Sequence, residues 1–294
     1  MGEVVLGIDF GGTKIALAVV DLGGRRLGSA VIPAAAESGA RSSLAGAIGA
    51  AQALLARVTP GERLAAVGVS TFGIPGPDGV ELAPAIDGWA HLALEREITA
   101  AFDGVPVRVA TDVKAAAQVE ADQGALAGCD PGLYLNLGTG LAAAIVADGK
   151  VIAGRHGASG EIGYNLRSLA DVGRLLDDRT PLEEAVSGGA LVAAVGASFF
   201  DRAPQEPAIL DAFLTELAFH LVNLTIAVDP QRIAVGGGMV RSWDLFQAPL
   251  RAALEAAVPY PPELVTAAFP YDAPLIGALA HGVAAATADK ETTR

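Results

Sequence analysis

Two stretches of this sequence share one order of elements: an apolar strand, a glycine-rich turn and a second apolar strand. The first turn is Asp9-Phe10-Gly11-Gly12-Thr13-Lys14, and the second is Gly138-Thr139-Gly140. Glycines in such turns let backbone N–H groups approach a phosphate closely, because no Cβ stands in the way. Either turn alone is also typical of an ordinary hairpin. Their repetition predicts two related domains that clamp one nucleotide, with a boundary near residue 113.

Composition limits what else such a chain can be. Its 294 residues suffice for one large domain or two ordinary ones, and its net charge of −13 argues against a nucleic-acid partner. A single cysteine, Cys129, excludes an internal disulfide framework and a cysteine metal cluster. No apolar leader precedes Asp9, and the apolar run 133–147 is too short and too polar to span a membrane. We therefore expect a soluble cytoplasmic protein without a membrane partner.

Further turns follow predicted strands, which is where α/β proteins place ligands. The strand 105–110 leads to Thr111-Asp112 at the start of an alanine-rich helix predicted over 114–127. A carboxylate held at a strand end is well placed for catalysis. The same two residues are equally well explained as the N-cap of that helix. A second strand, 233–235, leads into Gly236-Gly237-Gly238 and offers another nucleotide contact.

Taken in order, these motifs closely resemble those of the ROK family, a group of bacterial sugar kinases and repressors in the actin-like ATPase superfamily. The resemblance covers essentially the whole chain. It rests on the turns at 9–14 and 138–140, Gly73–Pro77 with Gly88-Trp89, the stretch 157–163, Val235–Gly238 and Leu275–Ala278. It implies an α/β protein with the two-domain actin-like ATPase (ribonuclease H-like) fold and an interdomain cleft. The smaller domain would comprise 1–112 with a C-terminal helix at about 275–294, and the larger domain 113–274.

The resemblance also implies ATP-dependent phosphorylation of a hexose hydroxyl, as in a glucokinase, with Mg²⁺ as cofactor. Asp112 falls on the position of the family's general base, and Asp9 on that of the carboxylate that holds Mg²⁺ through water. The residues implied for the nucleotide are Gly11, Gly12, Thr13, Lys14, Gly138, Thr139, Gly140, Gly236, Gly237 and Gly238. Those implied for the sugar are Gly73, Thr111, Asp112, Glu161, Tyr164 and Glu183. The expected partners are a small-molecule sugar and ATP, and the family suggests a homodimer.

The chain departs from the family pattern on the sugar side. Thr111 and Lys114 replace two asparagines of the catalytic motif, and Ala85 replaces a sugar-contacting asparagine. Tyr164 replaces a histidine that both touches sugar and ligates zinc, and the three zinc cysteines are replaced by Arg174, Leu176 and Pro181. None of these three side chains ligates zinc, so we expect no zinc. The loop would be held instead by packing and by Arg–Asp pairs among Arg174, Asp177, Asp178 and Arg179.

Three interpretations follow from these residues. The first is a glucokinase-like hexose kinase, and its substrate alternative is an amino or N-acetylated sugar. The second is a catalytically weak sugar or nucleotide sensor, favoured by the sugar-side substitutions and disfavoured by retention of the acids. The third, a ROK repressor, would require a DNA-binding segment before the first phosphate turn; only eight residues precede Asp9, so we do not expect a repressor. The sugar, its reacting hydroxyl and any donor other than ATP stay open.

Overall fold

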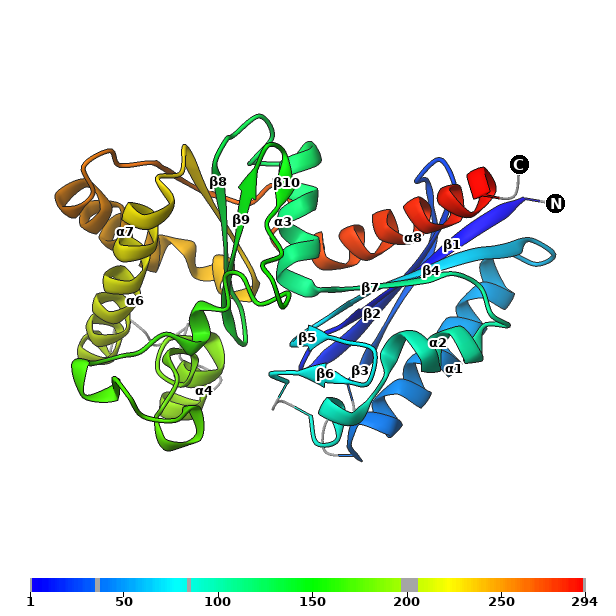
Figure 1. Cartoon of the computed structure of the whole chain (residues 1–294), viewed down its shortest axis with the longest axis horizontal. Coiled ribbons are helices and arrows are strands. Elements are labelled where there is room, and N and C mark those ends of the chain that lie inside the picture. The colour runs from blue at the N-terminus through cyan, green and yellow to red at the C-terminus, as the bar shows by residue number, and fades with distance from the viewer. Residues whose placement is uncertain (1, 35–37, 84–85, 197–205, 293–294) are drawn as a thin grey trace. The chain divides into compact units, whose positions relative to one another are not determined.

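The computed structural model describes residues 2–34, 38–83, 86–196 and 206–292 (Figure 1). The chain forms two compact units, Met1–Val119 with Asp272–Arg294, and Glu120–Tyr271. Each unit contains a mixed β-sheet with helices, which confirms the α/β class predicted from the sequence. The division falls inside α3 (Asp112–Gln123) rather than at its start. One reason is Glu120, whose fully buried carboxylate accepts N–H bonds from Ala125, Ala268 and Phe269 of the second unit.

The sheet of the first unit has the strand order β3-β2-β1-β4-β7. Its strands are β1 (Glu3–Phe10), β2 (Lys14–Asp21), β3 (Arg26–Pro33), β4 (Arg63–Thr71) and β7 (Val107–Thr111). The first three form an antiparallel meander, whereas β4 is parallel to β1 and β7 is parallel to β4. The carboxyl ends of β1, β4 and β7 therefore meet at one edge of the sheet. In register, Asp9 lies opposite Ser70, and Thr71 lies opposite Thr111.

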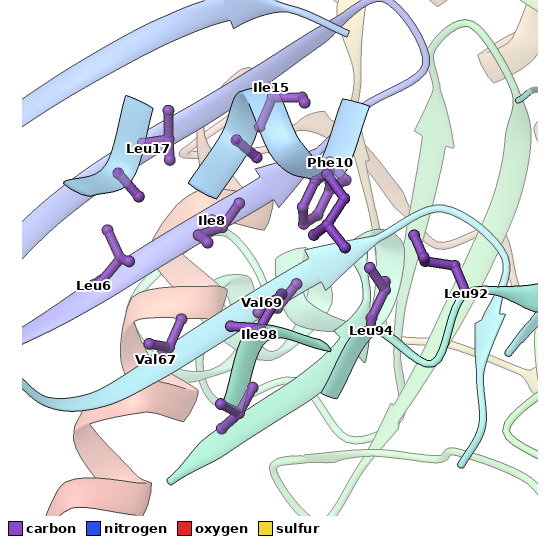
Figure 2. Close-up of a cluster of buried hydrophobic side chains, with 14 of the residues drawn as sticks. Leu6, Ile8, Phe10, Ile15, Leu17, Val67, Val69, Leu92, Leu94 and Ile98 are labelled. Carbon is purple, nitrogen blue, oxygen red and sulfur yellow. The ribbon is translucent and has the colours of Figure 1, made fainter. Parts of the chain in front are cut away.

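Both faces of this sheet are buried, so its central strands are apolar on both sides. Leu6, Ile8 and Phe10 of β1 point into a cluster that α1 (Ala40–Val58) and α2 (Leu94–Ala101) complete (Figure 2). The alternate residue Val5 joins a second cluster with leucine and alanine side chains of α8 (Ala273–Thr292). In Figure 1, α8 (red) runs along the strands, and it packs on β1, β4 and β7. The sheet edge that carries Asp9 is thus held rigidly from two sides.

A long connection follows β4 in the first unit. It contains two short paired strands, β5 (Ile74–Pro75) and β6 (Val80–Glu81), and the 3₁₀ turn η2 (Trp89–His91). Trp89 is fully buried, packs edge-on against Phe10 and stacks on Phe72. Its indole N–H donates to Thr71 Oγ1 at 3.2 Å. Trp89 is therefore a core residue that ties the later part of the connection back to the end of β4.

The sheet of the second unit repeats the plan of the first. Its order is β10-β9-β8-β11-β12, with a meander of three antiparallel strands and two strands added in parallel. The strands are β8 (Gly132–Leu137), β9 (Leu141–Ala147), β10 (Lys150–Val151), β11 (Arg232–Gly236) and β12 (Glu263–Thr266). Each meander places a glycine turn between its first two strands. This is the structural counterpart of the repeat seen in the sequence.

Helices and short turns cover the second sheet. The helices are α4 (Gly188–Val195), α6 (Pro207–Val228) and α7 (Trp243–Ala257). The 3₁₀ turns are η3 (Ile162–Tyr164), η4 (Leu169–Asp171), η5 (Leu176–Asp178), η6 (Leu182–Glu184) and η8 (Gly238–Ser242). By length and composition α6 alone among the described helices passes a test for crossing a membrane, a test that core helices of soluble proteins also pass. Here α6 packs Phe213, Leu217 and Leu221 into the core of the second unit.

Candidate functional site

Asp9 is the penultimate residue of β1, so its carboxylate lies at the edge of the sheet where the parallel strands end. Ser70, its neighbour on β4, donates a hydrogen bond from Oγ to Asp9 Oδ1 at 2.8 Å. Burial raises the pKa of Asp9 to about 6; the Ser70 hydrogen bond and the charge of Lys14 oppose that rise, and the charge of Asp272 adds to it. A carboxylate kept from water beside a second carboxylate is a site where a bound cation is favourable.

The turn after Asp9 exposes both its backbone and the ammonium group of Lys14. Gly11 N–H donates to Lys14 O at 3.0 Å, which closes the turn. A Cβ added at Gly12 would meet no atom within 4 Å, so the space beside this residue is open. The side chains of Thr13 and Lys14 are both exposed. Open backbone, a hydroxyl and an ammonium group in four residues are the components of a phosphate-binding turn.

Thr111 and Asp112 lie where β7 passes into α3. The buried Thr111 accepts the Lys114 N–H at Oγ1 (3.3 Å), and the half-buried Asp112 accepts the Val113 N–H at Oδ1 (2.8 Å). The Thr111 hydroxyl therefore supplies the side-chain cap of the helix. The side-chain cap of α3 therefore does not depend on Asp112 alone.

Gly73 opens the connection after β4, and Ala85 falls on a part of it outside the described residues. Gly73 has a φ of +73°, and an added Cβ would lie 2.7 Å from Glu81 O and from the Ala83 side chain. The connection is thus packed tightly upon itself at its start. The structure places Gly73 after the carboxyl end of β4, two residues beyond Thr71.

In the second unit, two glycine turns lie side by side. Gly237 has a φ of +94°, and a Cβ there would lie 2.4 Å from Leu137 O, immediately before the turn 138–140. Gly188 N–H, at the start of α4, donates to Gly138 O at 2.8 Å, and Gly189 N–H donates to Thr139 O at 3.0 Å. These bonds occupy two carbonyls of the turn. A Cβ at Gly238 would meet no atom within 4 Å, so the open space adjoins the 236–238 turn.

The second unit also brings three polar side chains together near the turn 138–140, namely Glu161, Tyr164 and Glu183. Glu183 Oε2 accepts the Leu141 N–H at 2.7 Å, and an added Cβ at Gly140 would lie 2.4 Å from that oxygen. Burial raises the pKa of Glu183; the Leu141 N–H opposes the rise, and the charges of Glu161 and Glu184 add to it. Burial, with the charges of Glu183 and Glu161, raises the pKa of Tyr164 to about 12. Tyr164 therefore keeps its hydroxyl proton near two carboxylates.

Comparison with known proteins gives these groups a context. A model of the ROK family matches residues 5–282. The chain belongs to the ROK family. It is similar to a kanosamine kinase of Amycolatopsis mediterranei, with 32% identity covering 79% of this chain and 80% of that protein. It is also similar to a glucokinase of Streptomyces coelicolor, with 30% identity covering 84% of this chain and 86% of that protein.

Solved structures agree with this assignment. A ROK family glucokinase from Streptomyces griseus, in complex with glucose and AMPPNP, superposes with a TM-score of 0.76 at 28% identity. The comparison covers 95% of this chain and 99% of that one. This ROK chain therefore has the two-domain actin-like ATPase fold that the motifs predicted.

The predicted site residues of this ROK chain divide between its two units. The first unit brings Asp9 and Asp112 to one edge of its sheet. The other predicted residues of this unit adjoin the ends of the same strands in sequence: Gly11, Gly12, Thr13, Lys14, Thr111 and Gly73. The second unit holds Gly138, Thr139, Gly140, Gly236, Gly237, Gly238, Glu161, Tyr164 and Glu183. Within each unit, residues far apart in sequence gather by the ends of strands, as expected for an α/β ligand site.

One expectation about this ROK protein is wrong. Arg174, Asp177, Asp178 and Arg179 do not form the Arg–Asp pairs predicted among them. Arg174 instead pairs with Asp171 at 3.6 Å, and Arg179 donates to the backbone carbonyls of Tyr164 (2.7 Å) and Asn165 (3.3 Å). Carbonyls within a folded loop bind a guanidinium without the entropy cost of ordering a second long side chain. Among the described residues, no group of three or more His, Cys, Asp or Glu side chains is arranged to hold a metal.

Sequence reasoning missed two residues that shape these sites, Ser70 and Asp272, and assigned a third, Arg179, the wrong partners. Ser70 binds Asp9 from a strand 61 positions away, and its signal was a hydroxyl at the end of a buried strand. Asp272 acts on Asp9 from just before α8, and an acid preceding a predicted helix was its only mark. Arg179 lies in a charged stretch where neither spacing nor periodicity distinguishes it from its neighbours.

Proposed function

We propose that this ROK chain is an ATP:sugar phosphotransferase of the hexokinase or glucokinase type, which transfers the γ-phosphoryl group of ATP to a hexose hydroxyl. The carrying observation is the common sheet edge at which Asp9, the open Gly12 turn and Asp112 lie. Relatives named glucokinase and kanosamine kinase support sugar phosphorylation as the activity. Phosphoryl transfer depends chiefly on positioning and on charge stabilisation, and these groups supply both.

In the proposed reaction Asp112 is the general base. Its carboxylate accepts the proton of the sugar hydroxyl as that oxygen forms its bond to the γ-phosphorus. The bond from phosphorus to the bridging oxygen breaks, and ADP leaves. Asp112 suits this role because the end of β7 and the start of α3 fix its backbone, and Thr111 already caps the helix.

Asp9 is the proposed ligand for Mg²⁺, through water. The fit rests on its partly buried carboxylate, whose raised pKa records how poorly water solvates the charge there. When bound, Mg²⁺ neutralises phosphate charge and thereby stabilises the transferring group. Gly11, Gly12, Thr13 and Lys14 would bind phosphate beside it, with backbone N–H groups, a hydroxyl and an ammonium group. The glycine turns at 138–140 and 236–238 are proposed to bind the rest of the nucleotide.

The proposed sugar contacts are Glu161, Tyr164 and Glu183, together with Thr111 and Gly73. Carboxylates accept hydrogen bonds from sugar hydroxyls and so fix the orientation of the ring. Tyr164 stays protonated, because its pKa lies at about 12, and it can therefore donate to a sugar oxygen. Two carboxylates near this phenol favour an amino sugar as a second candidate substrate, since an ammonium group would gain from both charges.

A coupled ADP-release assay against glucose, glucosamine, kanosamine, N-acetylglucosamine and N-acetylmannosamine tests the proposal. We expect turnover of at least one of these sugars at about 1–100 per second, a range typical of kinases, and none without Mg²⁺. Glucose as the best substrate would support the glucokinase assignment, and glucosamine or kanosamine the amino-sugar alternative. Sugar binding by calorimetry without turnover of any sugar would refute the kinase and favour a sensor.

We also propose that this chain functions without zinc. Arg174, Leu176 and Pro181 offer no zinc ligand, and the backbone of the 164–181 loop is bound by Arg179. Elemental analysis of the purified chain is expected to find far less than one zinc per chain, and a chelator is expected to leave sugar turnover unchanged once Mg²⁺ is restored. About one zinc per chain, lost together with activity, would contradict this.

A further inference from the structure

A short segment, residues 164–167, is bound by side chains from two other parts of the second unit, Arg179 and α6. Arg179 Nη2 and Nη1 donate to the carbonyls of Tyr164 and Asn165. The Asn165 amide lies 3.3 Å from Nδ1 of His220 on α6. Arg167 forms two hydrogen bonds with Glu216 of α6, at 2.5 Å and 2.9 Å. The segment is thus anchored by side chains although its own backbone belongs to no strand or α-helix.

Arg179 differs from the residues around it. Every other residue from Val172 to Thr180 is exposed, whereas Arg179 is half-buried. Its guanidinium reaches two consecutive carbonyls, which uses the fixed fork geometry that distinguishes arginine from lysine. Bonds from a charged donor are stronger than those between neutral groups. An inward arginine in an otherwise solvated stretch therefore holds the backbone at 164–165 in one place.

The neighbouring anchors act on different atoms. Burial lowers the pKa of His220, and its Nδ1 lies within hydrogen-bond distance of the Asn165 side-chain amide. The Arg167–Glu216 pair fixes the end of the segment to α6. Arg179 alone among these side chains bonds to the backbone of Tyr164 itself. Arg179 therefore holds the backbone from which the Tyr164 side chain projects.

Fixing Tyr164 also fixes Glu161. The Tyr164 N–H donates to Glu161 O at 3.1 Å across η3, so the two residues move as one turn. Glu183, the third member of the group, is held independently by the Leu141 N–H. A shift of the 161–165 turn would therefore change the spacing of Tyr164 and Glu161 relative to Glu183. That spacing decides which sugar hydroxyls the three side chains reach together.

We propose that Arg179 is a positioning residue for the sugar: its guanidinium fixes the Tyr164 turn so that Tyr164 and Glu161 face the sugar together with Glu183. The inference rests on the proposed kinase function and deepens it. In this proposal Arg179 contacts neither the sugar nor ATP. Its effect is on the affinity and selectivity for sugar, and the glycine turns assigned to ATP are left unchanged.

The test compares Arg179→Met and Arg179→Lys with Arg174→Met as the matched control. Arg174 lies in the same stretch, is exposed and pairs with Asp171 rather than with the backbone at 164–165. For Arg179→Met, we expect the KM of the best sugar to rise about tenfold, the typical loss for a charged hydrogen bond. The KM of ATP should stay within about twofold. Lysine should restore little, because it lacks the two-pronged donor.

Hydrogen exchange gives a readout independent of turnover. Amides of 164–167 are expected to exchange faster in Arg179→Met than in wild type, and at the wild-type rate in Arg174→Met. An active wild type whose Arg179→Met variant keeps its sugar KM would overturn the inference. So would equal rises in the KM values of sugar and ATP with a lowered Tm, which would mark a general structural role. A wild type inactive on every sugar would instead refute the proposed function, whatever the exchange rates.

Discussion

Replacing Asp112 with asparagine is expected to lower kcat for sugar phosphorylation by about 10²- to 10⁴-fold, the usual contribution of a general base. Asparagine has nearly the same shape, and its amide oxygen can still accept the Val113 N–H that Asp112 Oδ1 accepts. It cannot take a proton from the sugar hydroxyl. The KM values of ATP and sugar should therefore change only a fewfold. Steady-state kinetics on the best sugar would measure all three quantities.

The competing explanation of Asp112 is a helix cap, and it predicts a different result. A cap acts on stability, and its loss costs about 0.5–2 kcal/mol. Thr111 Oγ1 already accepts the Lys114 N–H, so we expect Asp112→Asn to keep its Tm within a few degrees of wild type. Asp122→Asn, an exposed acid on the same helix, is the matched control and should retain full turnover. A lowered Tm with kcat intact in Asp112→Asn would assign Asp112 to capping.

Much of the fold was readable in the sequence because local signals agreed with the tertiary structure. The two glycine turns lie between apolar strands, and both are present as the first turns of three-stranded meanders. Such elements are specified by their own residues, so no distant contact is needed to infer them.

Helix ends were predicted less well, because tertiary contacts decide them. The helix expected to reach residue 127 ends at Gln123, where the buried Glu120 carboxylate takes the Ala125 N–H along with two N–H groups near residue 268. Locally specified ends also occur: α4 ends at Val195, before Gly196 with a φ of +88°. The end of α3, by contrast, depends on residues more than 140 positions away, which no local pattern records.

The site shows the same division. Asp9 and Asp112 each follow an apolar strand, so their positions at strand ends were predictable. Their surroundings were not, because Ser70 and Asp272 reach Asp9 only through the parallel pairing of strands and the return of the chain in α8. The loop at 164–181 was misjudged for a related reason. Sequence proximity suggested Arg–Asp pairs, whereas Arg179 binds carbonyls that lie 14 and 15 residues earlier.

Asp9→Asn is expected to stabilise the nucleotide-free protein at neutral pH while abolishing Mg²⁺-dependent turnover. The folded pKa of Asp9, about 6, lies above its ordinary value of 3.8. Between pH 4 and 6 the folded chain therefore binds more protons than the unfolded chain, and stability falls as pH rises through this window. Above pH 7 the charge costs at most about 3 kcal/mol of unfolding free energy, from 1.36 kcal/mol per pKa unit. Asparagine removes that cost and can still accept the Ser70 hydrogen bond.

The positions of the two tryptophans allow the stability of the first unit, which contains Asp9, to be measured by fluorescence. Trp89 is buried in the first unit and Trp243 lies in the second, so in a Trp243→Phe background the fluorescence of Trp89 reports on the unit that contains Asp9. We expect urea unfolding in the presence of a chelator to give Asp9→Asn a larger free energy of unfolding than its parent at pH 7.5. Near pH 4 the two free energies should be equal.

Asp21→Asn is the control of opposite sign. Asp21 ends β2 in the same sheet, and its hydrogen bonds with Arg25 hold the pKa of that carboxyl below its ordinary value. Losing the Asp21 charge should give no gain in stability at pH 7.5.

Saturating MgATP should make Asp9→Asn less stable than its parent, because binding stabilises only the chain that retains the carboxylate. If Asp9→Asn were less stable than its parent without ligand, the carboxylate would be a structural group. A gain in stability together with a loss of turnover would instead mean that the Asp9 carboxylate destabilises the folded chain and is retained because it binds Mg²⁺.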